Sequence, residues 1–210
     1  MKRRGILIVV SGFSGAGKGT LMKELMKKYE NYALSISATT RTPRVGEEEG
    51  EAYFFKTEEQ FEKMIARDEL IEYANYVGNY YGTPRSYVEQ QLASGKDVIL
   101  EIELQGALKI RKQFPETLML FITPANVSDL LQRLVARGTE SEEVIRSRME
   151  RAFEEAQEMA CYDHVIINED LHKCVDDLHQ VVQAEHLRTM RNQEFIAKIQ
   201  KDLGENVKGE

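Results

Sequence analysis

A glycine-rich segment near the N-terminus constrains the fold of this chain more than any other feature. Residues 12–20 read Gly-Phe-Ser-Gly-Ala-Gly-Lys-Gly-Thr, after the apolar run 6–10 and before a helix-patterned stretch over 21–28. Glycine tolerates positive φ, so the backbone can curl and bring its N–H groups close to an anion. The following helix adds unpaired N–H groups and the positive end of its dipole. The order of strand, turn and helix therefore predicts a phosphate-binding loop rather than an ordinary tight turn.

Two side chains of this loop carry the expected chemistry. Lys18 supplies a mobile positive charge for the outer phosphates of a nucleotide, and Thr20 supplies a hydroxyl near the Mg²⁺ ion that accompanies them. Gly19 stands where a Ser or Thr usually follows the lysine, and the hydroxyl comes one position later. Contact of Thr20 with Mg²⁺ is therefore either direct or through a water molecule. The residues expected around the phosphates are Gly12, Phe13, Ser14, Gly15, Ala16, Gly17, Lys18, Gly19 and Thr20.

Length and charge limit the class of protein. The 210 residues are enough for one α/β domain with insertions. The net charge of −7 argues against general binding to nucleic acid or to a membrane surface, so local lysines and arginines must hold any anionic ligand. We expect no membrane span and no secretory leader. Cys161 and Cys174 are isolated in the sequence, which predicts reduced thiols that pack inside a cytoplasmic protein.

Strand and helix patterns alternate along the chain. Apolar runs typical of buried parallel strands occur at residues 5–11, 98–103, 118–123 and 164–168. Helical patterns separate these runs and begin near residues 18, 105, 127 and 171. This alternation predicts a mostly parallel sheet with helices on both faces. Ligands of such sheets bind beyond the carboxyl ends of the strands.

Two stretches interrupt the alternation. Residues 39–88 are rich in Tyr, Glu and Gly and contain several short strand-like pieces, which predicts a small inserted lobe. Residues 126–160 are typical of two helices joined near residues 138–140.

After Asp170 the pattern predicts one long amphipathic helix from Leu171 to about Leu203. Its histidines His172, His179 and His186 are seven residues apart, about 10.5 Å of rise, so they cannot share one metal ion. We expect them to form a solvated or subunit-facing stripe, and the helix leaves room for a homo-oligomer contact.

A second anion site is indicated downstream of the loop. Arg41 and Arg44 lie three residues apart around Pro43, and guanidinium groups bind phosphate oxygens in pairs. The alternative is an exposed basic turn. Tyr53 and the pair at residues 80–81 can stack on a base or bind phosphate, although packing in a strand is the commoner use of such rings.

These segments together resemble the guanylate kinase family, whose members transfer a phosphoryl group from ATP to GMP. The matching stretches are collinear over about residues 5–187 and comprise the loop, 37–44, 71–73, 78–83, 101–106, 137–140 and 165–170. The resemblance implies an α/β P-loop nucleoside-monophosphate kinase fold. This fold has a mostly parallel core sheet flanked by helices, an inserted mixed α/β lobe that binds GMP, and a helical lid. The implied division is a core of 1–38, 89–125 and 161–210, a GMP-binding lobe of 39–88 and a lid of 126–160.

The resemblance also assigns the GMP site. The residues implied around the phosphate of GMP are Arg41, Arg44, Tyr53 and Tyr81, and those implied around guanine are Ser37, Glu72, Thr83 and Glu103. One carboxylate can accept both the N1–H and the N2 amine of guanine, whereas adenine offers neither donor. The family often has Asp where this chain has Glu101 and Glu103, so the division between base contact and metal contact stays open. Glu101 is the candidate for the Mg²⁺ shell.

The residues implied to act in phosphoryl transfer are cationic: Lys18, Arg41, Arg133, Arg137 and Arg148. No catalytic base is expected, because the acceptor phosphate is already ionised with a second pKa of about 6. Asn168 matches a contact on the adenine side of ATP. The alternative role of Arg133 and Arg137 is ion pairing with neighbours such as Glu140.

The resemblance therefore implies a cytoplasmic ATP:GMP phosphotransferase of purine nucleotide metabolism that uses GMP or dGMP. A non-catalytic guanylate-kinase-like binding module is one alternative, but such a module could discard the loop lysine and the phosphate-binding arginines, which this chain retains. A kinase of another nucleoside monophosphate is a second alternative, and Ser37, Glu72 and Thr83 argue for guanine. A switch GTPase is disfavoured because the sequence has no Asn-Lys-x-Asp motif.

Overall fold

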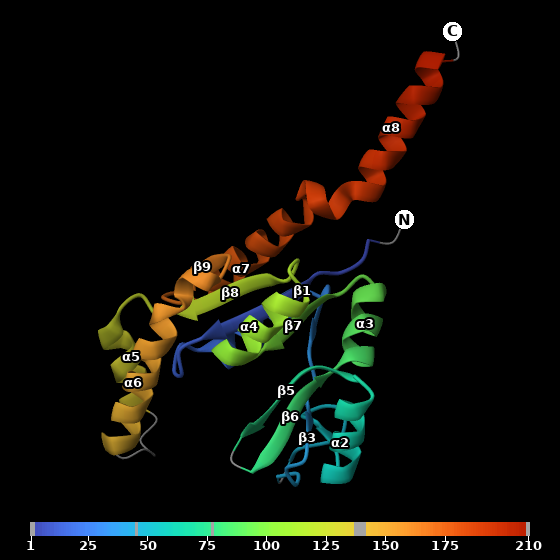
Figure 1. Ribbon diagram of the computed structural model, residues 1–210. Coiled ribbons are helices and arrows are strands. Elements are labelled where there is room, and N and C mark those ends of the chain that lie inside the picture. Colours follow the sequence, from blue (N-terminus) through green and yellow to red (C-terminus); the bar gives the residue numbers. More distant parts are fainter. Residues whose placement is uncertain (1–2, 45, 77, 137–141, 209–210) are drawn as a thin grey trace.

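The computed structural model describes residues 3–44, 46–76, 78–136 and 142–208. Its core is a five-stranded sheet in the order β2-β7-β1-β8-β9, and every neighbouring pair is parallel (Figure 1). The strands are β1 (Leu7–Gly12), β2 (Tyr32–Leu34), β7 (Asp97–Glu101), β8 (Leu118–Thr123) and β9 (His164–Ile167). The four predicted strands are confirmed. The sequence did not predict β2, because its apolar run is only three residues long.

Helices cover both faces of this sheet, as predicted. The helices concerned are α1 (Lys18–Lys28), α3 (Arg85–Ala93), α4 (Leu104–Gln113) and α7 (Leu171–His186). The connection from β1 to β2 runs toward the β2 edge of the sheet, whereas the connection from β7 to β8 runs toward the β9 edge. Since such crossovers are right-handed, α1 and α4 lie on opposite faces. α7 packs beside α1.

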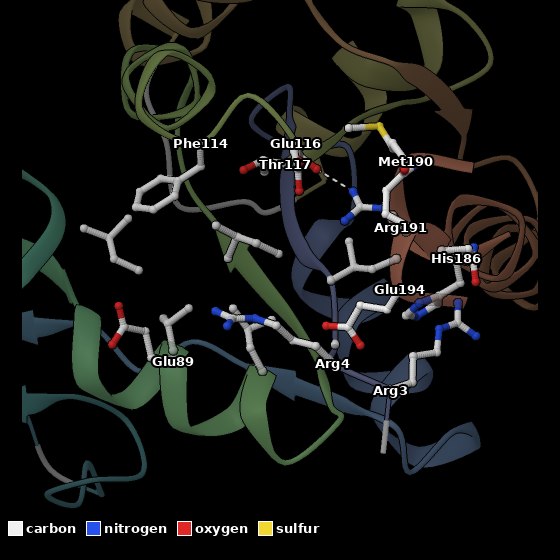
Figure 2. Close-up of a pocket in the computed structure, with 18 of the residues that line it drawn as sticks. Arg3, Arg4, Glu89, Phe114, Glu116, Thr117, His186, Met190, Arg191 and Glu194 are labelled. Atoms are coloured by element: carbon white, nitrogen blue, oxygen red, sulfur yellow. Dashed lines mark hydrogen bonds between the residues drawn. The ribbon is translucent and has the colours of Figure 1, made fainter. Parts of the chain in front are cut away.

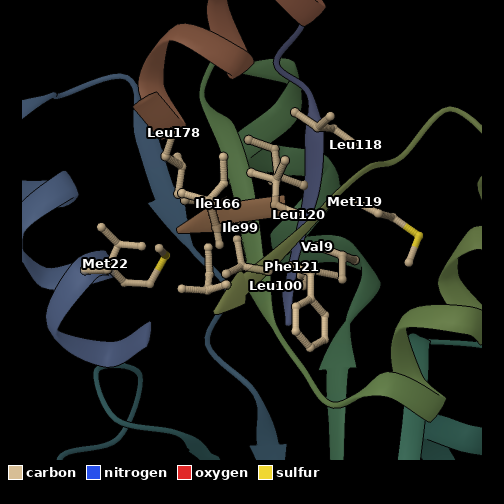
Figure 3. Close-up of a cluster of buried hydrophobic side chains, with 14 of the residues drawn as sticks. Val9, Met22, Ile99, Leu100, Leu118, Met119, Leu120, Phe121, Ile166 and Leu178 are labelled. Atoms are coloured by element: carbon tan, nitrogen blue, oxygen red, sulfur yellow. The ribbon is translucent and has the colours of Figure 1, made fainter. Parts of the chain in front are cut away.

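The core forms where the central strands are buried on both sides. Ile8, Val9 and Val10 have no exposed surface, which explains why β1 appears in the sequence as a continuous apolar run rather than an alternating one. Figure 3 shows the neighbouring strands contributing Ile99 and Leu120 to the same cluster.

A second, four-stranded sheet in the order β4-β3-β6-β5 lies below the core sheet in Figure 1. Its elements are β3 (Ala38–Thr39), β4 (Phe54–Phe55), α2 (Glu58–Ala66), β5 (Leu70–Tyr76) and β6 (Asn79–Pro84). It has a small core of its own, in which Phe61 is fully buried and stacks on Tyr80 with 5.2 Å between the ring centres. Thr57 and Gln60 form a capping box that starts α2.

Two further groups of helices extend from the core sheet. α5 (Val127–Val135) and α6 (Glu142–Gln157) stand at its carboxyl edge, and the short 3₁₀ helix η1 (Met159–Cys161) leads from them into β9. A 3₁₀ turn, η2 (Thr189–Asn192), separates α7 from α8 (Gln193–Lys208), which projects away from the body of the molecule. Among the described residues, none of the helices combines the length and the apolar character that a membrane-spanning segment requires.

The prediction of one continuous C-terminal helix is wrong. α7 ends at His186, where the side-chain amide of Asn192 donates to the carbonyl of His186 at 3.0 Å and to that of Arg188 at 2.9 Å. These bonds satisfy carbonyls that a continuing helix would have used, and the chain changes direction.

The predicted histidine stripe is confirmed at His172, which is exposed, and is wrong for His179 and His186, which have partners inside the protein. His179 stacks on Tyr29 with 3.7 Å between ring centres, and its Nδ1 lies 2.8 Å from the hydroxyl of Tyr32. His186 is buried, with Nε2 2.7 Å from Oδ1 of Asp97. The pattern of the helix could not reveal these partners, because they belong to distant strands and helices.

The two cysteines behave differently. Cys174 is buried in the core, as predicted. Cys161 is exposed, and the prediction that it packs inside is wrong, because it lies at the surface end of η1.

Asp97 joins three parts of the core, and its loss tests that arrangement. Its carboxylate accepts bonds from the backbone N–H of Ile6 at 2.9 Å, from Asn31 at 3.1 Å and from His186. We expect Asp97→Ala to lower the free energy of unfolding by about 3 kcal/mol, since it leaves buried donors unpaired. Asp97→Asn, which keeps one acceptor oxygen, should lose less. Urea unfolding measures both, and a loss below about 1 kcal/mol for Asp97→Ala would contradict this role.

Candidate functional site

The phosphate loop follows β1 at the centre of the sheet and leads directly into α1. Gly12, Gly15 and Gly17 all have positive φ, of 152°, 93° and 88°. A Cβ atom on Gly17 would lie 2.6 Å from Nδ2 of Asn168, so this position excludes any side chain. Gly17 is also the N-cap of α1 and offers no side chain to its first turn. The N–H groups of that turn therefore face the loop, where an anion can accept their bonds.

The ammonium group of Lys18 lies across the loop. Its Nζ donates to the carbonyl oxygens of Gly12 at 2.6 Å and Phe13 at 3.1 Å. Glu101, at the end of β7, is close enough for its charge to interact with Lys18; partial burial raises the pKa of the Glu101 carboxyl and Lys18 opposes that shift. Thr20 is exposed on the first turn of α1. A positive charge, a carboxylate and a hydroxyl thus surround the loop.

Asn168, which directly follows β9, and Arg133 on α5 both hydrogen-bond the loop at Ala16. Nδ2 of Asn168 donates to the carbonyl oxygen of Ala16 at 2.8 Å. Nη1 of Arg133 donates to the same oxygen at 3.2 Å, while its Nη2 donates to the carbonyl of Asn168 at 2.8 Å. On α6, Arg148 donates to the hydroxyl of Ser14 at 2.5 Å. The structure therefore brings these three predicted residues to the loop, and Arg137 lies outside the described residues.

A second cluster surrounds Arg41 on the smaller sheet. Nη2 of Arg41 lies 2.8 and 2.9 Å from the two carboxylate oxygens of Glu47, and its Nη1 donates to the carbonyl of Thr42. The guanidinium group lies over the ring of Tyr53, 5.3 Å from its centre. Hydrogen bonds to Glu47 and to Tyr81 raise the pKa of Arg41. Arg41, Tyr53 and Tyr81 thus form one cluster, in which the two tyrosine rings lie 6.1 Å apart between their centres.

Glu47 is a residue that the sequence reasoning missed. Its carboxylate also accepts the backbone N–H of Arg44 at 2.8 Å, and this bond is the largest cause of its lowered pKa. It stands in an acidic run, residues 47–49, whose sequence indicates only a solvated turn. Both of its carboxylate oxygens lie against one nitrogen of Arg41.

Glu72 and Thr83 form a polar pair on β5 and β6. Thr83 is buried and its hydroxyl donates to Oε1 of Glu72 at 2.8 Å. Burial raises the pKa of Glu72, although the bond from Thr83 opposes the shift. A carboxylate shielded from water in this way is well placed to accept a pair of N–H donors from a ligand. Ser37 lies one residue before β3 of the same four-stranded sheet, and its carbonyl accepts the N–H of Phe54 at 2.8 Å.

Glu103 makes a contact that the sequence did not predict. It is the N-cap residue of α4, and its Oε2 lies 2.6 Å from Nη2 of Arg151 on α6. Arg151 also bonds Glu155, one turn further along the same helix, at 3.3 Å. Arg151 and Glu155 therefore connect α6 to the edge that carries Glu103. The i,i+4 spacing of Arg151 and Glu155 indicates their own pairing, but nothing in the sequence indicates Glu103 as the third member.

The described residues contain no group of three or more His, Cys, Asp or Glu side chains suited to a metal ion. A cavity of about 770 Å³ lies at the opposite, amino-terminal end of the sheet, where Arg4, Phe114 and Arg191 contribute to its lining (Figure 2). None of the predicted site residues lines that cavity.

The comparisons with known proteins agree on one family. The family model described as guanylate kinase matches residues 4–185. A guanylate kinase of Halalkalibacterium halodurans is 52% identical over 190 residues, covering 90% of this chain and 93% of that protein. A guanylate kinase of Bacillus subtilis is 50% identical over 192 residues, covering 91% and 94%. The crystal structure of guanylate kinase from Anaplasma phagocytophilum is similar with a TM-score of 0.70 and 32% identity, covering 90% of each chain.

Two neighbouring glycines of the loop provide a matched test of its geometry. Gly17→Ala should weaken ATP binding at least about tenfold, because a Cβ here forces a disfavoured φ and displaces the Asn168 amide. Gly19→Ala is the control, since its Cβ would meet no atom within 4 Å, and the change should alter the affinity by less than about threefold. Calorimetric titration with ATP measures both. Equal affinities for the two variants would contradict the assigned role of Gly17.

Proposed function

We propose that this chain, which belongs to the guanylate kinase family, reversibly transfers the γ-phosphoryl group of ATP to GMP or dGMP, giving ADP and GDP. The observation that carries the proposal is the pairing of two anion-binding clusters, one around Lys18 and one around Arg41, with the buried Glu72–Thr83 pair. Together they supply a place for a triphosphate, a place for a monophosphate, and a carboxylate suited to guanine. In this proposal residues 1–38, 89–125 and 161–210 form the core, 39–88 bind GMP, and 126–160 act as a lid.

The proposed ATP site is the loop Gly12–Thr20. Its backbone N–H groups and the first turn of α1 bind the phosphates, and Lys18 follows the β and γ groups. Asn168 fixes the loop through Ala16, which supports a position beside the adenine end of the nucleotide. Thr20 and Glu101 provide the oxygen donors that Mg²⁺ prefers, directly or through water, and they fit an ion that keeps most of its own water ligands. When bound, Mg²⁺ neutralises part of the phosphate charge.

The proposed GMP site lies on the smaller sheet. Arg41, Arg44, Tyr53 and Tyr81 bind the phosphate, which takes over bonds that Arg41 makes with Glu47. A dianionic phosphate competes well for a guanidinium group, because charge-assisted bonds strengthen with the charge of the acceptor.

Guanine is proposed to lie against the Glu72–Thr83 pair. The ionised carboxylate of Glu72 accepts N1–H and the N2 amine, while the hydroxyl of Thr83 holds the carboxylate in place. Ser37 and Glu103 complete the surroundings of the base. AMP would leave the Glu72 carboxylate desolvated and without donors, which disfavours it as a substrate.

The transfer step in this proposal depends on positioning and charge rather than on a base. The acceptor is an ionised phosphate oxygen that attacks the γ-phosphorus in line, and the bond to the β-phosphate oxygen breaks. Lys18, Arg41, Arg133, Arg137 and Arg148 stabilise the charge on the transferring group. Arg133 and Arg148 already contact the loop, which supports a lid that closes over the phosphates and excludes water.

We also propose that the protein works in the cytoplasm and without nucleic-acid or membrane partners. Its net charge of −7 supports the second part, because a negative field repels polyanions and anionic lipid surfaces.

A coupled assay of ADP formation tests this function. With ATP as donor we expect turnover with GMP and dGMP and little with AMP, UMP or TMP. Lys18→Ala and Arg41→Met should each reduce kcat/KM by about 10² or more, because each removes a charge next to a phosphate. Lys23→Ala, an exposed change on the same helix as Lys18, is the control and should leave turnover unchanged. Absence of ADP with every acceptor would favour a binding module, and near-normal turnover of both site variants would overturn the mechanism.

The raised pKa of Glu72 predicts a pH effect on GMP alone. As the pH falls toward that pKa, the carboxylate takes up a proton and can no longer accept both donors of guanine. The KM for GMP should therefore begin to rise at a higher pH than it would if Glu72 had the pKa of an ordinary glutamate. Glu72→Gln should raise KM for GMP about tenfold or more and remove this pH step, with KM for ATP nearly unchanged. Steady-state kinetics between pH 5 and 8 measure both constants. Equal losses for the two substrates would count against base recognition by Glu72.

A further inference from the structure

The projecting helix α8 carries an unpartnered apolar stripe. Phe195, Ile199, Leu203 and Val207 are 62%, 41%, 61% and 78% exposed, although each is a large apolar residue. They follow one another at intervals of four residues, and each step of four turns the helix by about 40°, so the stripe is about 120° wide. Figure 1 shows α8 extending away from the rest of the molecule, and the element that it contacts most is η2.

A helix of this kind is not expected to be stable without a partner. α8 has 16 residues, includes Gly204, and has few tertiary contacts, so its own hydrogen bonds barely offset the cost of ordering the chain. Amphipathic helices gain most of their stability by burying the apolar face. The stripe therefore indicates a surface that something covers.

The spacing of the stripe matches a second copy of the same helix. The four residues are symmetric about position 201: in an antiparallel pair centred there, Phe195 faces Val207 and Ile199 faces Leu203 of the second copy. The large Phe195 of one copy meets the smaller Val207 of the other, so the two helix axes keep an even separation along the pair. We propose that α8 is a dimerisation helix that pairs antiparallel with α8 of a second copy of this chain.

The charges beside the stripe support the antiparallel direction. Lys198 and Asp202 border it on one side, one turn apart, and both are exposed. A twofold axis near residue 201 brings this border against the same border of the second copy. Lys198 of each chain then lies about 3 Å along the helix axis from Asp202 of the other, and the two Asp202 residues lie about 3 Å apart as well, so each Lys198 also offsets the repulsion between these carboxylates. The opposite border carries the uncharged Gln193 and Gln200. A parallel pair would set the charged border against the uncharged one and gain nothing from it.

The base of α8 provides further apolar surface. Phe195 and Met190 line the cavity shown in Figure 2, and Leu187, three residues before Met190 in the chain, is 78% exposed. In the antiparallel pair Val207 of the second copy reaches Phe195, so its helix end lies at the mouth of this cavity. This contact adds buried area to the helix pair. The pair is only about 24 Å long, and by itself it would bury less than the roughly 800 Å² per chain of a standard interface.

The first test is the mass of the full chain in solution. Sedimentation or light scattering at concentrations from about 1 to about 100 μM should give a species of twice the single-chain mass of 24.1 kDa. Leu203→Glu should return it to a single chain at all these concentrations. Ala197→Glu, which adds the same charge to the same helix on the face away from the stripe, should remain dimeric. Both variants should retain turnover, because α8 lies outside the proposed nucleotide sites.

The second test concerns direction and uses paired charge changes. Lys198→Asp and Asp202→Lys should each weaken the dimer at least about tenfold by placing like charges together, and the double variant should recover it. A mixture of the two single variants should form the heterodimer in preference to either homodimer. A single-chain mass for the unaltered protein, or a dimer unaffected by Leu203→Glu, would overturn the proposal. If the double variant regains the dimer mass but the mixed single variants show no preference for the heterodimer, the antiparallel arrangement would be overturned.

Discussion

The parallel pairing of β1 with β7 and β8 is the interaction on which the rest of the structure depends. Val10 lies in register with Glu101, and Gly12 lies in register with Ile122. Because the strands are parallel, the loop after β1 comes beside the end of β7 and its glutamates. β9 pairs in turn with β8, which brings Asn168 to the back of the loop. Buried apolar strands thus set the positions of the polar groups that follow them.

Several cations of the candidate site have partners within the described part of the protein. Arg41 is paired with Glu47, Arg151 with Glu103, and Arg148 with Ser14. In a chain with a net charge of −7, these contacts hold each guanidinium group in a defined place. In the proposed function, the phosphate of GMP takes the place of Glu47 as the acceptor for Arg41.

Elements encoded by a continuous pattern of residues could be predicted from the sequence, whereas features that depend on residues distant in the chain could not. The strand over 118–123 and the start of α7 at Leu171 were predicted correctly, because a buried apolar run and an amphipathic period are local patterns. The break after His186 was missed, because it depends on Asn192 reaching back to carbonyls of α7. For the same reason a histidine expected in solvent is buried against Asp97.

The sequence by itself determined the phosphate loop, its lysine and the alternating strands and helices, because each is encoded by neighbouring residues. The tertiary structure decided which side chains meet. Asn168 bonds a loop residue 152 positions away, Arg151 bonds Glu103 across 48 positions, and Glu47 faces Arg41 because a turn folds back. Such contacts depend on how the sheets and helices pack, and packing is a property of the whole chain rather than of any segment. The phosphate loop can therefore be recognised from its sequence, whereas the residues that hydrogen-bond it can be identified only in the folded protein.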